Sequence, residues 1–204
     1  ISGVHPPDAG DILLDGTSLA ALPPRRRVAA GLARSFQNIR LMPHLSAVEN
    51  VMLGQHARAG GLAALLTPLA RSRWRREAEA LLAATGLDIP PGAVVSDLPY
   101  GLRKKIEVVR ALASRPKLLL LDEPAAGLNP SETADLARFL RGIAAEGTTV
   151  LVVEHDMAFV EEVCDRVVVL NFGRVIFAGT LAEARADAAV REAYLGADEH
   201  ADAA

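Results

Sequence analysis

Apolar runs separated by polar capping residues predict an alternation of strands and helices in the second half of the chain. An uninterrupted apolar run at residues 118–121 is typical of a strand buried in a parallel sheet. A helix with a periodic apolar face, capped by Asn129 and Glu132, follows this run. A second apolar run at residues 148–153 is expected to be the next buried strand. This order predicts an α/β domain with a mainly parallel sheet.

The middle of the chain has a different pattern. Between residues 45 and 115 the apolar positions recur with helical spacing and no convincing strand is present, so we expect a helical subdomain there. The remaining predicted elements are a strand at 11–14, a helix from Pro24 to Gly31, a strand at 32–36, a helix after Asp156, a hairpin of strands at 166–170 and 174–177, and a single final helix from Thr180 to Leu195.

Composition and charge exclude several classes of protein. The chain has 204 residues, of which 50% are hydrophobic, so it can bury the core of one domain or a small pair. No uncharged apolar run approaches the roughly 18 residues that a membrane-spanning helix needs. The net charge of −3 gives no general reason to bind nucleic acid. The single cysteine, Cys164, cannot form an internal disulfide, which favours a reducing compartment.

The strongest candidate for chemistry is the acidic pair at the end of the run LLLLDEP. A buried strand that ends in Asp122 and Glu123 places two carboxylates at the carboxyl edge of a parallel sheet, where ligands bind. Asp122 is suited to a hydrated Mg²⁺, and Glu123 to orienting or deprotonating an attacking water. The structural alternative is an acidic pair that caps the next helix after a core strand.

Three further features carry little weight alone. Tyr100 and Gly101 lie at the start of a predicted helix, where free N–H groups and the helix dipole favour an anion. His155 follows the second apolar run and is suited to hydrogen-bonding a phosphate oxygen, although a lone histidine is more often structural. The amide of Gln37, at the end of a predicted strand, is able to contact both metal and water.

The order and spacing of these features give them weight together. Over essentially its whole length the chain resembles the ATP-binding-cassette (ABC) ATPases. The segments that carry the resemblance to the branched-chain amino-acid transporter branch of that family are RSFQNIRLMPHLSAVENVMLGQHAR, LPYGLRKKIEVVRAL, LLLLDEPAAGLNP, VVEHDM and the closing AYLG. The resemblance implies an ABC ATPase fold, with a mainly parallel P-loop NTPase-like sheet and an inserted helical subdomain.

The resemblance also implies a role for each matching residue, with ATP and Mg²⁺ as cofactors. Gln37 would be the Q-loop glutamine that senses Mg²⁺ and the attacking water, Asp122 the Walker B ligand of Mg²⁺, and Glu123 the general base. His155 would be the switch histidine, and the D-loop would contain Gly127, Leu128 and Asn129. The signature motif, which binds the ATP of the opposite subunit, would consist of Leu98, Pro99, Tyr100, Gly101 and Leu102.

As a functional unit, the resemblance implies the ATP-hydrolysing subunit of an importer for branched-chain amino acids or related small solutes. Two cassettes would pair head to tail as a homodimer or heterodimer, peripheral to the cytoplasmic face of the cell membrane. Membrane permease subunits would be direct partners, residues 46–92 being the expected contact region, and a periplasmic or surface solute-binding protein an indirect one. No nucleic acid is expected as a partner.

The chain departs from the family at its beginning. None of its three lysines follows a glycine, so the phosphate-binding Walker A loop, Gly-x4-Gly-Lys-Ser/Thr, is absent from this sequence. We therefore expect the N-terminal strands and the phosphate loop to be missing, and these residues alone to bind ATP weakly or not at all and to be prone to aggregation. Leu102 and Arg103 stand where the branch usually has two glutamines.

The expected domains are an incomplete RecA-like core at 1–44, a helical subdomain with the signature motif at 45–115, the rest of the core with Walker B, D-loop and switch histidine at 116–180, and a C-terminal helix and tail at 181–204. Two other functions stay open. One is a non-catalytic truncated cassette that pairs with an intact one. The other is a soluble non-transport ABC protein acting on nucleic acid through the arginines of residues 71–76, which are more often a solvated helix face.

Overall fold

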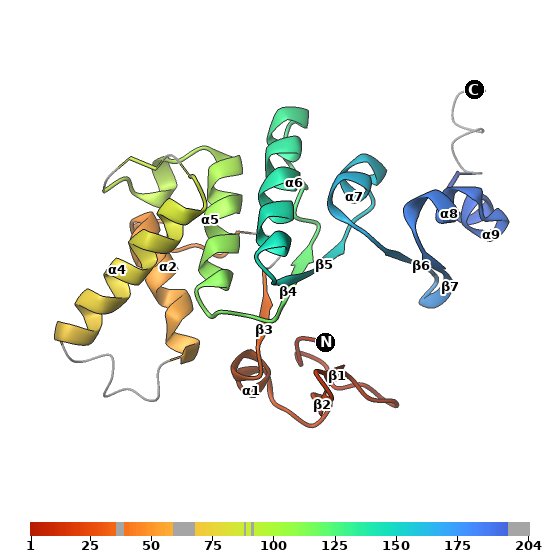
Figure 1. Cartoon of the computed structure of the whole chain (residues 1–204), viewed down its shortest axis with the longest axis horizontal. Coiled ribbons are helices and arrows are strands. Elements are labelled where there is room, and N and C mark those ends of the chain that lie inside the picture. Colours follow the sequence, from red (N-terminus) through yellow and green to blue (C-terminus); the bar gives the residue numbers. More distant parts are fainter. Residues whose placement is uncertain (36–38, 59–67, 88, 91, 196–204) are drawn as a thin grey trace. The chain divides into compact units, whose positions relative to one another are not determined.

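A computed structural model describes residues 1–195, except residues 36–38, 59–67, 88 and 91 (Figure 1). The chain divides into two compact units, Ile1–Glu154 and His155–Ala204. Within the described ranges, no helix has the length and apolar character that crossing a membrane requires.

The first unit is built on a parallel sheet. Its strands lie in the order β3 (Leu32–Arg34), β4 (Leu118–Asp122) and β5 (Thr149–Val153). The central strand β4 is buried on both faces, as its apolar run predicted. Helix α6 (Pro130–Ala145) connects β4 to β5 and buries Leu136, Leu140 and Ile143. The predicted α/β architecture is therefore confirmed in this unit.

The prediction that β5 is a buried strand was wrong. Its residues alternate between exposed and half-buried, with Leu151 39% and Val153 56% exposed. In the described part of the chain β5 pairs with β4 alone and forms an edge of the sheet. An edge strand lacks a neighbour on one side, so its side chains are enclosed less than those of a central strand and an apolar run does not guarantee their burial.

Smaller elements at the beginning of the chain pack beneath β3 and β4. Strands β1 (Leu13–Leu14) and β2 (Thr17–Ser18) form an antiparallel hairpin, and α1 (Pro24–Ala29) follows. The side chain of Arg27, only 2% exposed, donates to three backbone carbonyls and so closes this region. Leu19 and Leu32 form a small core with Leu120 of β4.

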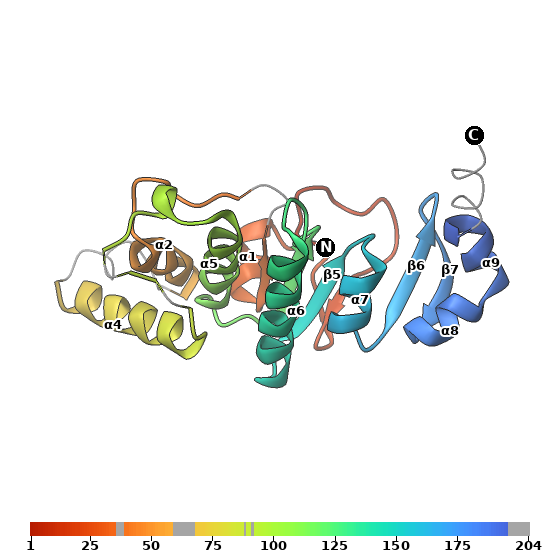
Figure 2. The ribbon, with the colours of Figure 1, turned by 90° about the horizontal axis from the view of Figure 1, so that it is seen from above.

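A helical region follows β3, as predicted. It contains α2 (Ala47–Gly54), η1 (Gln55–Arg58), α4 (Pro68–Ala84), η2 (Val95–Asp97) and α5 (Tyr100–Leu112). Figure 2 shows α2, α4 and α5 packed beside one another. Their shared core consists of Leu41, Ala47, Val51, Ala78, Leu82, Val95, Leu98, Ile106, Val109 and Ala113.

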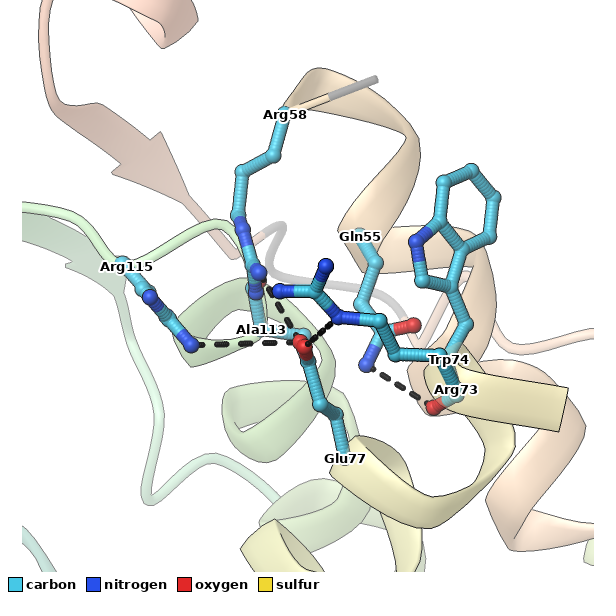
Figure 3. A network of polar contacts seen from close by, with 7 residues as sticks. All are labelled: Gln55, Arg58, Arg73, Trp74, Glu77, Ala113 and Arg115. Carbon is cyan, nitrogen blue, oxygen red and sulfur yellow. Dashed lines mark hydrogen bonds and ion pairs between the residues drawn. The ribbon is translucent and has the colours of Figure 1, made fainter. Parts of the chain in front are cut away.

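A polar network centred on Glu77 lies within this helical region (Figure 3). The Glu77 carboxylate of α4 accepts from Arg58 at 2.8 Å and from Arg73 at 3.0 Å, and lies 3.8 Å from Arg115. Arg58 also donates to the Ala113 carbonyl at 3.2 Å. The hydrogen bond from Arg58 is the main reason that the pKa of Glu77 is lowered. The network thus joins η1, α4 and the end of α5.

The second unit begins with α7 (Met157–Val163), capped by Asp156 as predicted. A hairpin of β6 (Val167–Asn171) and β7 (Arg174–Gly179) follows, which confirms the predicted antiparallel pair. The prediction of one final helix was wrong, because the structure has α8 (Leu181–Ala186), α9 (Ala188–Val190) and η3 (Arg191–Leu195). The break is at Asp187, whose carboxylate accepts from the amides of Ala189 and Val190 and caps a new turn.

Candidate functional site

The acidic pair lies where the central strand ends. Asp122 is the last residue of β4, and Glu123 follows it with a φ of 45°. The Glu123 amide donates to the Val153 carbonyl of β5 at 2.9 Å, and this hydrogen bond holds the backbone of Glu123 against β5. A left-handed conformation is uncommon for a residue other than glycine, and such residues concentrate at functional turns. The chain therefore turns sharply at Glu123, directly after β4.

Arg34 is a member of this site that sequence reasoning missed. Its Nη2 lies 3.0 Å from Asp122 Oδ2, and both side chains are partly exposed. The pair forms because β3 and β4 are parallel neighbours whose carboxyl ends meet at one edge of the sheet. The available signal was position alone, since Arg34 lies in the strand that was predicted directly before Gln37. The ion pair fixes the orientation of the Asp122 carboxylate.

Glu154 is a second residue without a predicted role. It follows β5, and its Oε1 accepts from the Ala125 amide at 2.9 Å. The loop after β4 is therefore tied to the end of β5 on the same edge of the sheet. A carboxylate that accepts backbone N–H groups stabilises a fixed loop conformation.

The predicted anion-binding turn lies at the start of α5. Pro99 is the residue before the helix, and its side chain makes no capping hydrogen bond. The first-turn N–H groups therefore lack the side-chain acceptor that a Ser or Asp would provide. Leu98 is buried in the helical core, whereas Tyr100 is partly exposed at the turn. This turn presents backbone donors and the positive end of a helix dipole.

Two of the predicted segments are brought together in the structure. A Cβ on Gly101 would lie 2.8 Å from Oε1 of Glu132. Glycine at this position therefore leaves space for the Glu132 carboxylate. Glu132 and Asn129 cap α6 reciprocally, with hydrogen bonds of 3.0 and 3.1 Å. Gly127, with a φ of 79°, lies close to the Tyr100 ring. The start of α5 thus contacts both the loop after β4 and the start of α6.

Two positively charged side chains lie near the Tyr100 ring. The guanidinium carbon of Arg103 lies 5.6 Å from the ring centroid and Lys104 Nζ lies 5.7 Å from it. Cations at these distances interact favourably with an aromatic ring. They also add to the field of the helix N-terminus, which favours a phosphate group there.

The geometry of this site does not test two of the predicted site residues. Gln37 lies outside the described residues. His155 is the first residue of the second unit, directly before the Asp156 cap of α7. The roles predicted for these two residues stay predictions.

The donors at the sheet edge suit a hard cation shared with a substrate. Within the described ranges, no cluster of three or more His, Cys, Asp or Glu residues forms a complete metal cage. Mg²⁺ is usually held by one or two carboxylates together with phosphate oxygens and water. The partly exposed Asp122, with Glu123 next to it, fits this requirement.

The arrangement matches the class of ATP-binding cassettes. A nucleotide-free ATP-binding cassette from an ABC transporter superposes with a TM-score of 0.81 at 23% identity, over 95% of this chain and 80% of that one. The cbiO1 protein of Clostridium perfringens, part of the ABC transporter complex cbiONQ, gives a TM-score of 0.76 at 27% identity, over 94% and 74% of the two chains. The predicted ABC ATPase fold is confirmed.

Sequence comparison gives the family. The family described as "ABC transporter" matches residues 1–126, and one described as "Branched-chain amino acid ATP-binding cassette transporter" matches residues 174–200. The chain belongs to the ATP-binding proteins of ABC transporters, a family of transport ATPases. Two similar relatives are the high-affinity branched-chain amino acid transport ATP-binding proteins BraF of Pseudomonas aeruginosa and LivG of Escherichia coli K12. They are 37% and 36% identical, each over 96% of this chain and 80% of the relative.

Proposed function

We propose that this chain is the ATP-hydrolysing subunit of an importer for branched-chain amino acids or related small solutes. The observation that carries the proposal is the 37% identity to BraF over 96% of the chain. The second match, over residues 174–200, comes from a different part of the chain and supports the same substrate class. The alternatives, a non-catalytic cassette and a nucleic-acid protein, have no comparable support.

The sheet edge is proposed as the hydrolytic centre. Asp122 would hold Mg²⁺ with the phosphate oxygens of ATP, and Glu123 would accept the proton of the attacking water. When bound, Mg²⁺ would neutralise the charge that develops on the phosphates. Gln37 and His155 are proposed to contact the water and the γ-phosphate. The position of Asp122 at the carboxyl end of the central parallel strand supports this assignment.

The turn at α5 is proposed to bind the ATP of a second cassette. Residues 98–102 would place backbone N–H groups and Tyr100 against the γ-phosphate, and residues 127–129 would line the same contact. The packing of Gly127 on Tyr100 supports a shared surface. A helix N-terminus stabilises transition-state charge most when closure of a dimer excludes water.

The proposed domains separate the core that contains the hydrolytic centre from the helical subdomain. Residues 1–44 and 116–180 would form the catalytic core, residues 45–115 the helical subdomain, and residues 181–204 a C-terminal segment that begins with the short helices α8 and α9. The helical region is proposed to contact permease subunits through residues 46–92, at the cytoplasmic face of the membrane. A periplasmic or surface solute-binding protein would be an indirect partner, and no nucleic acid is expected as a partner.

The test is the substitution Glu123→Gln in the complete natural protein with its partner subunits. We expect ATP hydrolysis to fall on the order of 10²-fold or more, while nucleotide-bound dimers persist, because the amide keeps the shape but cannot take the proton. Glu146→Gln, at the exposed end of α6, is the matched control and should hydrolyse ATP normally. Normal turnover by Glu123→Gln would contradict the general base. Uptake of leucine that does not depend on ATP hydrolysis would contradict the importer function.

A further inference from the structure

Arg34 connects three segments of the chain at the carboxyl edge of the parallel sheet. From the end of β3, its Nη2 donates to Asp122 Oδ2 of β4 at 3.0 Å. Its Nη1 donates to the Ser2 hydroxyl at 3.0 Å. The guanidinium therefore uses one terminal nitrogen on a charged partner and the other on a neutral partner. The charged partner is the carboxylate that is proposed to hold Mg²⁺, so two different cations would use the same group.

The register of the two strands explains why Arg34 reaches this carboxylate. Arg34 is paired with Leu120, and Asp122 follows two residues later on β4. Because side chains alternate between the two faces of a sheet, Arg34, Leu120 and Asp122 lie on the same face. Leu32 and Leu120 of that face share a small core, which agrees with this assignment. Two strand residues span roughly 6–7 Å, a distance that suits a long cationic side chain.

The ion pair is placed so that it can open. Among the described residues, Arg34 is the only cation that pairs with the Asp122 carboxylate. The Arg34 and Asp122 side chains are 30% and 39% exposed, so separating them leaves neither charge buried. A partly exposed pair of this kind contributes little to stability. Another cation with a higher charge can therefore replace Arg34 at Asp122 without unfolding the sheet edge.

We propose that Arg34 is a positioning residue that occupies the Asp122 carboxylate until a metal–nucleotide complex binds, and that it thereby disfavours binding of a divalent cation without nucleotide. The proposal rests on the proposed function, because it takes Asp122 as the metal ligand. A guanidinium and a divalent cation repel each other at one carboxylate, so Arg34 lowers the affinity for the metal alone. The phosphates of a nucleotide bring negative charge with the metal, and this charge offsets the repulsion.

Two substitutions in the complete natural protein remove one cation each from opposite ends of β4. Arg34→Met breaks the pair at the carboxyl end and keeps a long apolar side chain. Lys117→Met is the matched control, because Lys117 directly precedes β4 and forms an exposed pair with Asp15 at 2.6 Å. Both substitutions change the net charge by the same amount, but only Arg34→Met changes the charge beside the proposed metal ligand.

The probe is Mn²⁺ without nucleotide, whose free concentration is measured by electron paramagnetic resonance. We expect Arg34→Met to raise the affinity for Mn²⁺ by about three- to ten-fold, since a partly exposed pair is worth up to about five-fold and the divalent charge enlarges the effect. Lys117→Met should stay within about two-fold of the unmodified protein. The affinity of Arg34→Met for the Mn²⁺ complex of a non-hydrolysable ATP analogue, measured by calorimetry, should change by no more than about two-fold.

Asp122→Asn separates this inference from the proposed function. In the Asp122→Asn background, Arg34→Met should change the affinity for Mn²⁺ by less than about two-fold, because the shared carboxylate is gone. If Asp122→Asn binds the Mn²⁺ complex of the analogue as tightly as the unmodified protein, Asp122 is not the metal ligand. That result would overturn the proposed hydrolytic centre and this inference with it.

Other outcomes overturn the role of Arg34 and leave the proposed function intact. One is an unchanged affinity for Mn²⁺ in folded Arg34→Met. Another is an equal gain in Lys117→Met, because net charge alone would then explain the effect. If Arg34→Met does not fold, as judged by circular dichroism, Arg34→Gln decides by the same criterion, since it also removes the charge but keeps a polar side chain.

Discussion

The helical region and the strand β5 of the same unit bury their apolar residues to different degrees. In the helical region Val51, Ile106 and Val109 are completely buried among α2, α4 and α5. In β5, Val153 is 56% exposed although its sequence is just as apolar. The helices cover one another's apolar faces, whereas β5 has a single paired neighbour in the described part of the chain. Apolar content alone therefore does not decide burial, because neighbouring elements must also cover the apolar side chains.

The largest expected effect tests how closely the helices pack. A Cβ on Gly54, the last residue of α2, would lie 1.9 Å from the Arg110 carbonyl oxygen of α5. Gly54→Ala should therefore force the two helices apart and lower the free energy of unfolding by about 3 kcal/mol. Urea unfolding followed by the fluorescence of Trp74, the only tryptophan, measures this in the helical region.

Gly142→Ala is the matched control for that substitution. Gly142 lies inside α6, and a Cβ there meets no atom within 4 Å. Alanine should stabilise α6 by roughly 0.5–1 kcal/mol, because glycine loses more backbone entropy in a helix. Unfolding followed by far-UV circular dichroism measures the gain. Equal effects of the two substitutions would show that α2 and α5 are not in the close contact described.

The next effect compares the two regions with one chemical change. Val109→Ala removes two methyl groups from the closed helical core and should cost about 2 kcal/mol of unfolding free energy. Val153→Ala removes the same groups from the exposed face of β5 and should cost well under about 1 kcal/mol. Urea titrations of both variants, followed by circular dichroism, give the difference. A larger loss for Val153→Ala would mean that β5 is covered in the folded protein.

Much of the fold was predictable because local signals agreed with one another. The capping boxes at Ser46, Asn129 and Thr180 mark helix starts that the structure confirms. The break at Asp187 was missed, because a short acidic side chain is compatible with a helix interior and with a new cap. The exposure of β5 was missed, because it depends on which strand lies beside it and not on its own residues.

The candidate site was predictable in part for a similar reason. The order of motifs placed Asp122, Glu123 and the Tyr100 turn, and the structure locates each at the end of an element. The Arg34–Asp122 pair and the Glu154–Ala125 bond join segments that are far apart in sequence. Such contacts follow from strand order, which the apolar pattern of a single chain does not specify.

The smallest expected effect tests whether the charged network at Glu77 adds to the stability of the helical region. Glu77→Gln leaves Arg58, Arg73 and Arg115 without their shared carboxylate and should lower stability by about 1 kcal/mol at neutral pH. Glu79→Gln is the matched control, because Glu79 makes one exposed pair with Arg75 and should cost no more than about 0.5 kcal/mol.

Acid should distinguish the two variants further. Because the pKa of Glu77 is lowered in the folded protein, mainly by the hydrogen bond from Arg58, the folded state binds fewer protons there than the unfolded state. The stability that Glu77 contributes is fully present above its ordinary pKa of 4.5 and is lost as the pH falls through the lowered value. The unmodified chain should therefore lose more stability than Glu77→Gln between pH 6 and pH 3, as measured by Trp74 fluorescence in urea. Parallel curves for the two proteins would show that the arginines are held by packing and not by the carboxylate.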